Sequence, residues 1–166
     1  MDTPAFNRWF SASKVVDGQG LPLVVYHGTN NQFTAFGLSE AGDFGAGCYF
    51  AKSRSYADGY GKAIMPVYLS LQNPFTYKAP RDSDVAHDFA RFVLSSDEAA
   101  EAIERQAGEP VIGDETTSAL EQRGYDGIIA TYPDGLVDYI AFRPEQIKCA
   151  TGNNGLFDPG NPDIRC

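Results

Sequence analysis

The sequence predicts a single α+β domain, and three features of its pattern support that prediction. Apolar segments typical of β-strands occur in the first and last parts of the chain. A stretch of helical pattern, residues 81–123, separates them, without a regular alternation of strand and helix. The length of 166 residues suits one ordinary domain, and no internal repeat is evident. We therefore expect one domain over residues 1–166, with a mixed rather than a doubly wound architecture.

The first expected element is a short amphipathic helix, because three aromatic residues of "PAFNRWF" recur at three- and four-residue spacing. The glycines and the proline of "DGQGLP" then predict a turn, so residues 1–20 should form a helix and a turn. The apolar run "LVVYHGT" predicts the first strand, which ends at residues 27–29.

A loop rich in glycine and polar residues, 30–46, leads to a second short strand, "CYFAK". Ser53 predicts the N-cap of a helix through "RSYADGY". The third extended segment, "AIMPVYLSLQNPF", contains Pro66, which has no backbone N–H and so favours an edge position or a bulge. Residues 81–123 then hold three segments of helical pattern, each beginning at acidic or hydroxyl residues.

The clearest local prediction is a hairpin in "YDGIIATYPDGLVDYIAF". Two apolar strands flank residues 132–135, whose proline and glycine occupy the second and fourth positions of a type I turn. Residues 151–166 are rich in Gly, Asn, Asp and Pro and are expected to form an irregular tail, which wraps the surface or leads towards a further domain.

Composition argues against several classes of function. The chain has a net charge of −9, so tight nonspecific binding of nucleic acid is not expected. Its apolar runs are too short to span a bilayer, and its N-terminus lacks the layout of a secretory signal. Its three cysteines show no CxxC spacing, which argues against a disulfide framework or a zinc site. We expect a cytoplasmic protein that has no membrane partner.

Two polar residues at apolar strands are candidates for chemistry. His27 is either a half-buried histidine with satisfied hydrogen bonds or a polar group at the mouth of a cleft, where Gly28 lets a ligand approach. Asp138 lies within "LVDYIAF", where a buried carboxylate without partners would be costly. It either belongs to the strand or is solvated just ahead of a strand that begins at Tyr139. The second histidine, His87, is expected on a solvated helix face.

The stretch "FGAGCYFAKSRSYADGYG", residues 44–61, has the glycine content of a phosphate-binding loop. A Walker loop would continue with Lys and then Ser or Thr, and a dinucleotide fingerprint would need a glycine where Phe50 stands. Both motifs are therefore rejected. What remains is Tyr49 on a strand and Tyr60 eleven residues later, on the following helix. A strand–helix corner can hold both rings as the walls of a slot for a flat ring.

Taken together, three segments resemble the His–Tyr–Glu class of ADP-ribosyltransferases, which includes the poly(ADP-ribose) polymerases and diphtheria toxin. They are "YHGT", "GCYFA" with its second tyrosine, and the acid within "DYIAF". Flanking stretches such as "LQNPF", "GYDGII" and "PEQIKCATGNNGLFDPGNPDIR" are similar to a bacterial and phage-associated branch, the ART-PolyVal-like domains. The resemblance covers nearly the whole chain and implies an ADP-ribosyltransferase fold. In that fold two small antiparallel sheets form an NAD⁺ cleft, with helices around them.

The resemblance also implies roles for the matching residues. His27 would hydrogen-bond the adenosine ribose, with the Thr29 hydroxyl near the same ribose. The Gly28 backbone would hold the nicotinamide carboxamide, and Tyr49 and Tyr60 would sandwich the nicotinamide ring.

Asp138 would take the place of the family glutamate, which hydrogen-bonds the nicotinamide-ribose hydroxyls. The expected catalytic residues are thus His27, Tyr49 and Asp138, with NAD⁺ as co-substrate and no metal. A carboxylate at the ribose is worth more in an oxocarbenium-like transition state than in the ground state, which makes it catalytic.

The chain departs from the family pattern at several positions. Asp138 is one methylene shorter than glutamate, so either its strand sits closer or the activity is weaker, and Glu145 is the fallback acid. Ala57 stands where the polymerases carry a serine for the carboxamide. Leu136 stands where the arginine-modifying toxins carry Gln or Glu, so neither arginine modification nor chain extension is expected.

The implied activity is that of an NAD⁺-dependent mono-ADP-ribosyltransferase, which transfers ADP-ribose to a macromolecular acceptor (protein or nucleic acid) and releases nicotinamide. It would be a monomeric toxin or effector of a bacterium or phage, acting in the bacterial cytosol or in a target cell, and an antitoxin or immunity protein is a candidate partner. Two alternatives stay open: an NAD⁺ glycohydrolase, and a non-catalytic NAD- or partner-binding module of a phage polyprotein. The loops 30–46 and 77–112 are expected to select the acceptor.

Overall fold

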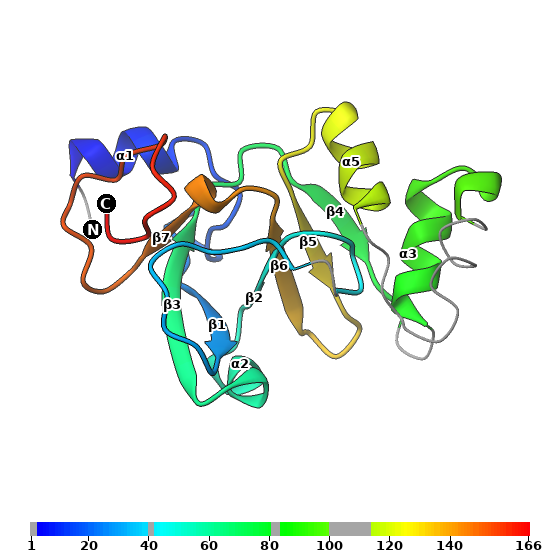
Figure 1. Cartoon of the computed structure of the whole chain (residues 1–166), viewed down its shortest axis with the longest axis horizontal. Helices are drawn as coiled ribbons and strands as arrows, with labels where there is room; N and C mark the ends of the chain where they lie inside the picture. The colour runs from blue at the N-terminus through cyan, green and yellow to red at the C-terminus, as the bar shows by residue number, and fades with distance from the viewer. Residues whose placement is uncertain (1–2, 40–41, 81–83, 100–113) are drawn as a thin grey trace.

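The computed structural model describes residues 3–39, 42–80, 84–99 and 114–166 (Figure 1). Its main element is a seven-stranded sheet with the strand order β4-β5-β6-β2-β1-β3-β7. The strands are β1 (Val25–Thr29), β2 (Cys48–Ala51), β3 (Ala63–Leu69), β4 (Phe75–Lys78), β5 (Gly127–Thr131), β6 (Val137–Ala141) and β7 (Ile147–Cys149). The β4–β5 pair is parallel and all other neighbours are antiparallel. Strands and helices are mixed without regular alternation, as the α+β prediction requires.

The helices are α1 (Pro4–Phe10), α2 (Arg54–Ala57), α3 (Val85–Val93) and α5 (Glu115–Gln122), with the 3-10 turns η1 (Asp58–Tyr60) and η2 (Pro144–Gln146). Three of these helices lie at the two ends of the sheet, and α2 packs on β1 near its middle. Figure 1 shows α1 with both termini at the β7 end, and α3 and α5 at the β4–β5 end. Residues 96–99 are also helical. The rest of the second helical segment predicted within residues 81–123 lies outside the described residues. None of the helices described is long and apolar enough to cross a membrane.

The expected division into two separate sheets is not confirmed. β2 pairs with β6 along its whole length and β1 pairs with β3 along its whole length, but β1 and β2 share only the pair Tyr26–Ala51. This single pair, which we call the seam, joins the two halves into one sheet. Sequence patterns identify strands but not their partners, so the seam could not be foreseen.

Most of the local elements expected from the sequence are present. They include the N-terminal helix, the strands at 25–29 and 48–51, the short helix after Ser53, and the hairpin of β5 and β6. In the hairpin turn the N–H of Gly135 donates to the carbonyl of Tyr132 at 3.0 Å, and Gly135 has a φ of 88°. This geometry is a type I turn followed by a left-handed residue, which glycine adopts without strain.

Two strands, β4 and β7, were not predicted. Both are short, and neither shows a long alternation in the sequence.

Pro66 does not lie on an edge strand, although its missing N–H had suggested one. β3 lies between β1 and β7, but its pairing with β7 begins only at Val67. Pro66 therefore stands just beyond β7, where its carbonyl accepts the Ala150 N–H at 2.9 Å and its missing N–H leaves no gap in a ladder.

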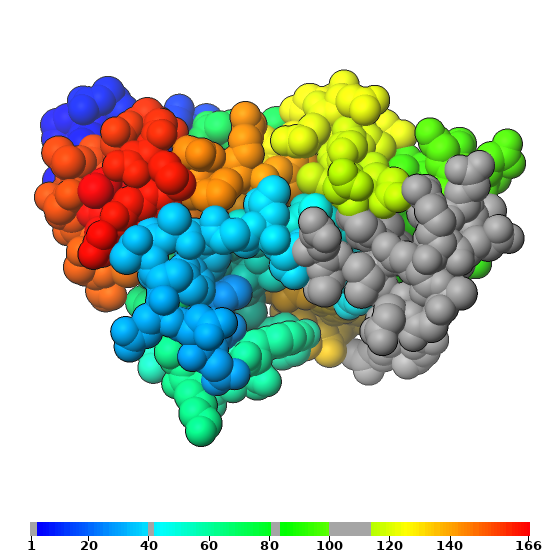
Figure 2. Space-filling model, in the orientation of Figure 1, coloured from blue at the N-terminus to red at the C-terminus, as the bar shows by residue number. Residues whose placement is uncertain are grey.

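The tail after β7 is irregular, as expected, yet it is firmly attached. The side chain of Lys148 is fully buried, and its Nζ donates to the carbonyls of Asn161 at 2.7 Å and Asp163 at 3.0 Å. Phe157 packs edge-on against Phe6 of α1, with ring centroids 5.1 Å apart. Figure 2 shows this tail (orange to red) packed beside α1 (blue), with the loop after β1 (light blue) running across the same face.

Candidate active site

A cavity of about 520 Å³ lies beside the seam and is lined from both halves of the sheet. Its walls come from β1, β2, β6, the loop between β1 and β2, the α2–η1 turn and the β5–β6 hairpin. Its size falls in the range of small-molecule sites. All six residues singled out in the sequence line it: His27, Gly28, Thr29, Tyr49, Tyr60 and Asp138.

His27 is fixed in orientation at the β1 side of the cavity. Its Nδ1 lies 2.8 Å from the backbone carbonyl of Tyr49, which can only accept, so Nδ1 carries the proton. The ring packs against Phe33, Phe36 and Phe50, with centroids 5.0–6.1 Å away. Burial in this apolar environment lowers the pKa of His27 below its usual value. His27 therefore presents a neutral ring, with Nε2 as its hydrogen-bond acceptor.

Glycine is required at position 28 for a packing reason that the sequence pattern did not predict. A Cβ at this position would collide with the backbone carbonyl of Ala57, and a Cβ at Gly61 would collide with the backbone of Thr29. Both glycines are thus needed because the α2–η1 turn lies directly on β1. The Thr29 hydroxyl is already used locally, since it accepts the N–H of Asn31 at 3.1 Å. Close packing of the turn brings Tyr60 to the cavity.

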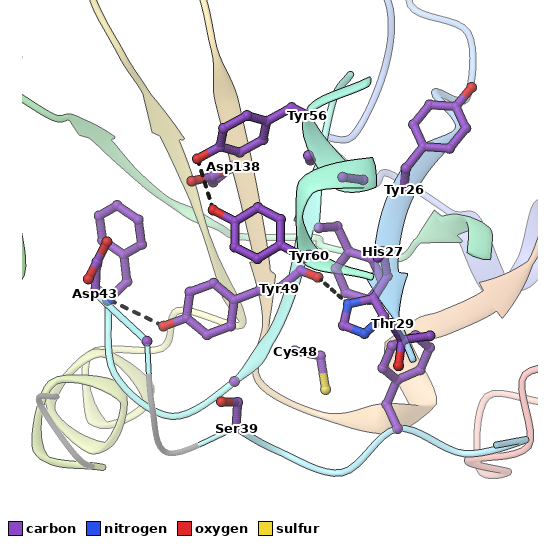
Figure 3. A pocket seen from close by; sticks show the side chains of 18 of the residues that line it. Tyr26, His27, Thr29, Ser39, Asp43, Cys48, Tyr49, Tyr56, Tyr60 and Asp138 are labelled. Carbon is purple, nitrogen blue, oxygen red and sulfur yellow. Dashed lines mark hydrogen bonds between the residues drawn. The ribbon is translucent and has the colours of Figure 1, made fainter. Parts of the chain in front are cut away.

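The two predicted tyrosines occupy different environments. The Tyr49 hydroxyl donates to the Gly45 carbonyl at 2.5 Å and accepts the Phe44 N–H at 3.2 Å, so it holds the loop before β2 in place. Tyr60 is 65% exposed, and its hydroxyl donates to that of Tyr56 at 3.1 Å. Figure 3 shows the rings of Tyr49, Tyr56 and Tyr60 pointing the same way, with that of Tyr60 drawn between the other two.

Asp138 belongs to β6, paired with Ala51 on one side and Ala130 on the other, so the interpretation of a strand beginning at Tyr139 is wrong. Its Oδ2 accepts a hydrogen bond from the Tyr132 hydroxyl at 3.1 Å. Burial raises the pKa of Asp138 to about 6, and the Tyr132 hydrogen bond opposes that rise.

The fallback acid, Glu145, is not among the cavity residues. It lies in η2, where its carbonyl accepts the Trp9 indole N–H at 3.1 Å. His87 likewise does not line the cavity, and it pairs with Asp84 at 2.7 Å on α3. Of the two acids considered from the sequence, Asp138 is therefore the one that lines the cavity with the predicted histidine and tyrosines.

Comparison with known families identifies the family of the chain. A family model described as "ADP-Ribosyltransferase in polyvalent proteins" (ART-PolyVal) matches residues 17–157. The chain belongs to the ART-PolyVal family. No curated protein matches the chain. Among solved structures, an anti-CRISPR protein is similar, with 16% identity and a TM-score of 0.40 over 75% of this chain and 91% of that one.

The cavity of this ART-PolyVal domain contains further polar residues that sequence reasoning missed. Tyr56, Tyr132 and Asp43 all line it. Tyr56 precedes Tyr60 by four residues, the spacing that brings side chains together on one helix face, so a signal for it existed. Tyr132 was interpreted only as a turn residue, and nothing in the local pattern marks Asp43.

The electrostatic character of the cavity follows from its lining. The carboxylates of Asp43 and Asp138 face it, while no lysine or arginine is among the described residues that line it. The negative charge of Asp43 adds to burial in raising the pKa of Asp138. The cavity is therefore aromatic and acidic, which suits a ligand part that is flat and positively charged.

Proposed function

We propose that this ART-PolyVal domain is an NAD⁺-dependent mono-ADP-ribosyltransferase, which transfers ADP-ribose to a macromolecular acceptor and releases nicotinamide. The observation that carries the proposal is the convergence of three distant segments on one cavity. They supply a neutral histidine from 27–29, two tyrosines from 49–60 and the half-buried Asp138. The family assignment supports the same class of chemistry.

The positively charged end of NAD⁺ suits this cavity. Nicotinamide in NAD⁺ is a flat cation, and the ring faces of Tyr49 and Tyr60 with two nearby carboxylates suit it. The pyrophosphate has no lysine or arginine partner among the described lining residues, so its contacts fall to neutral donors and solvent. Ala57 is buried in this turn and offers no hydroxyl to the carboxamide.

Each residue has a defined part in the proposed reaction. His27 offers Nε2 as an acceptor for a ribose hydroxyl, and the tyrosine rings hold the leaving nicotinamide and exclude water. The glycosidic bond breaks as positive charge builds on the ribose, and the Asp138 carboxylate stabilises that charge most strongly in the transition state. The acceptor's nucleophile then bonds to the ribose carbon and its proton leaves to solvent.

The role in the cell is part of the same proposal. We place the protein in a bacterial or phage context, as a toxin or effector active in bacterial cytosol or in a target cell, with an antitoxin as its partner. Leu136, two residues before Asp138, offers no second acid or amide, which argues against arginine as the acceptor.

The test is to incubate the protein with NAD⁺ labelled in the adenylate part, with and without bacterial lysate, and to follow free nicotinamide as well. Label on a macromolecule in the wild type, lost in Asp138→Ala, is the expected result. If free ADP-ribose were the only labelled product, the activity would be NAD⁺ glycohydrolysis and not transfer. If no lysate supported nicotinamide release, both the transferase and the glycohydrolase activity would be overturned. The remaining interpretation would be a non-catalytic binding module.

A further inference from the structure

The two oxygens of the Asp138 carboxylate have different surroundings. Oδ2 accepts the hydroxyl of Tyr132 at 3.1 Å, and the described residues supply no other hydrogen bond to this carboxylate. The part of the chain that the structure describes contains no buried side-chain N or O atom without a partner. Oδ1 is therefore accessible from the cavity, which Asp138 lines.

Tyr132 is itself held firmly. It is the first residue of the β5–β6 turn, where its N–H donates to the Leu136 carbonyl at 2.9 Å and its carbonyl accepts the Gly135 N–H at 3.0 Å. Its ring packs against the buried cluster that contains Phe44 and Ile140. With the backbone and the ring both fixed, the hydroxyl occupies a defined position beside Asp138.

We propose that Tyr132 is the positioning residue of this active site: its hydroxyl holds Oδ2 so that Oδ1 faces the reacting ribose. The inference rests on the proposed function. A short aspartate on a strand still rotates about two side-chain torsions, and one hydrogen bond from a fixed donor selects a single orientation. In this way the hairpin turn fixes the orientation of the short Asp138 side chain.

Tyr132 also keeps the carboxylate in its reactive, ionised form. Around Asp138 lie Asp43 from the loop before β2, Tyr49 from β2 and Tyr56 from α2, and only Tyr132 donates a hydrogen bond to it. That bond lowers the pKa of Asp138 against the effect of burial. The pKa of Tyr132 is raised, so its hydroxyl keeps the proton that it donates.

The experiment compares wild type with Tyr132→Phe, which removes only the hydroxyl. The matched control is Tyr125→Phe, at a tyrosine outside the cavity whose ring packs on Phe75. Steady-state nicotinamide release is measured from pH 5 to 8, and melting temperatures confirm that all three proteins are folded. For Tyr132→Phe we expect kcat to fall about 10- to 100-fold with little change in KM. The acid limb of its pH profile should move to higher pH, because a hydrogen bond to the charged form is lost.

Two results would overturn the inference. One is a Tyr132→Phe enzyme with wild-type kcat and an unmoved acid limb. The other is an equal loss in Tyr125→Phe, which would indicate a general packing effect.

Failure of the proposed function is separable from failure of this inference. If the wild type releases no nicotinamide, the carboxyl ¹³C resonance of Asp138, assigned with Asp138→Asn, is titrated instead. A titration midpoint that moves to higher pH in Tyr132→Phe supports the positioning role without any activity, and an unmoved midpoint contradicts it.

Discussion

The two ends of the cavity are held in place by different kinds of interaction. At the β1 end, His27 is fixed by three phenylalanine rings and one backbone carbonyl. At the β6 end, Asp138 is fixed by the hydroxyl of Tyr132, with the tyrosine pair Tyr56–Tyr60 nearby. The first end depends on packing and the second on hydrogen bonds and charge. Binding and chemistry should therefore respond to different perturbations.

The largest expected effect comes from removing the carboxylate. Asp138→Ala should lower kcat by about 10²- to 10³-fold, because in the proposed reaction it removes the charge that stabilises the developing ribose cation. Asp138→Glu should retain or raise activity, since it restores the family acid. Single-turnover nicotinamide release measures both, and Glu145→Ala, at a residue that does not line the cavity, serves as the control with unchanged activity. Equal losses in Glu145→Ala and Asp138→Ala would show that the acid was misassigned.

Damage to the β1 end should appear as lost stability and lost binding. Phe36 is 6% exposed and packs on His27, so Phe36→Ala should cost about 3–5 kcal/mol of unfolding free energy. It should also raise the KM for NAD⁺ more than it changes kcat. Urea unfolding and steady-state kinetics check this, with Phe92→Ala as control, because Phe92 is 65% exposed and should lose under about 1 kcal/mol. A kcat effect without a KM effect would remove the distinction between the two ends.

The pH dependence should come from the β6 end. The proposed reaction needs Asp138 ionised, and the pKa of Asp138 is raised to about 6, so kcat should fall about tenfold per pH unit below that value. Burial lowers the pKa of His27 below its usual value, so His27 stays neutral near pH 7 and KM should change little there. Rate profiles from pH 5 to 8 measure both quantities. If KM rather than kcat changed at low pH, the titrating group would be His27 and not Asp138.

The smallest expected effect is on stability at the β6 end. A carboxyl whose pKa is raised in the folded state destabilises that state once it ionises, so Asp138→Asn should stabilise the fold by about 1–2 kcal/mol at pH 7. The gain should disappear below about pH 4, where aspartate is protonated in both the folded and unfolded states. Urea unfolding at pH 4 and 7 measures it. Asp134→Asn in the exposed turn is the control and should show no such change.

Sequence reasoning found the site residues where a local motif marks them and failed where a contact depends on tertiary pairing. His27, Tyr49 and Asp138 each lie in a short recognisable strand. Tyr132 reaches Asp138 only because the hairpin pairs Ala130 with Asp138, a register that no local pattern states. The packing role of Gly28 was missed, since the carbonyl of Ala57 that it accommodates comes from the α2 turn.

The same distinction holds for the fold. The helix at α1 and the β5–β6 hairpin follow from periodicity and turn chemistry, and both were foreseen. β7 is only three residues long; its pairing with β3 and the burial of its own Lys148 define it, and neither can be read from the sequence of the strand.

The seam has a consequence for motion. Because Tyr26–Ala51 is the single pair between β1 and β2, the amides beside it lack the continuous ladder that protects β5 and β6. Hydrogen exchange with deuterium should therefore be faster along this line than between β5 and β6. A nucleotide bridging the two halves would slow that exchange, so occupancy of the cavity becomes visible by mass spectrometry even when no bond is broken.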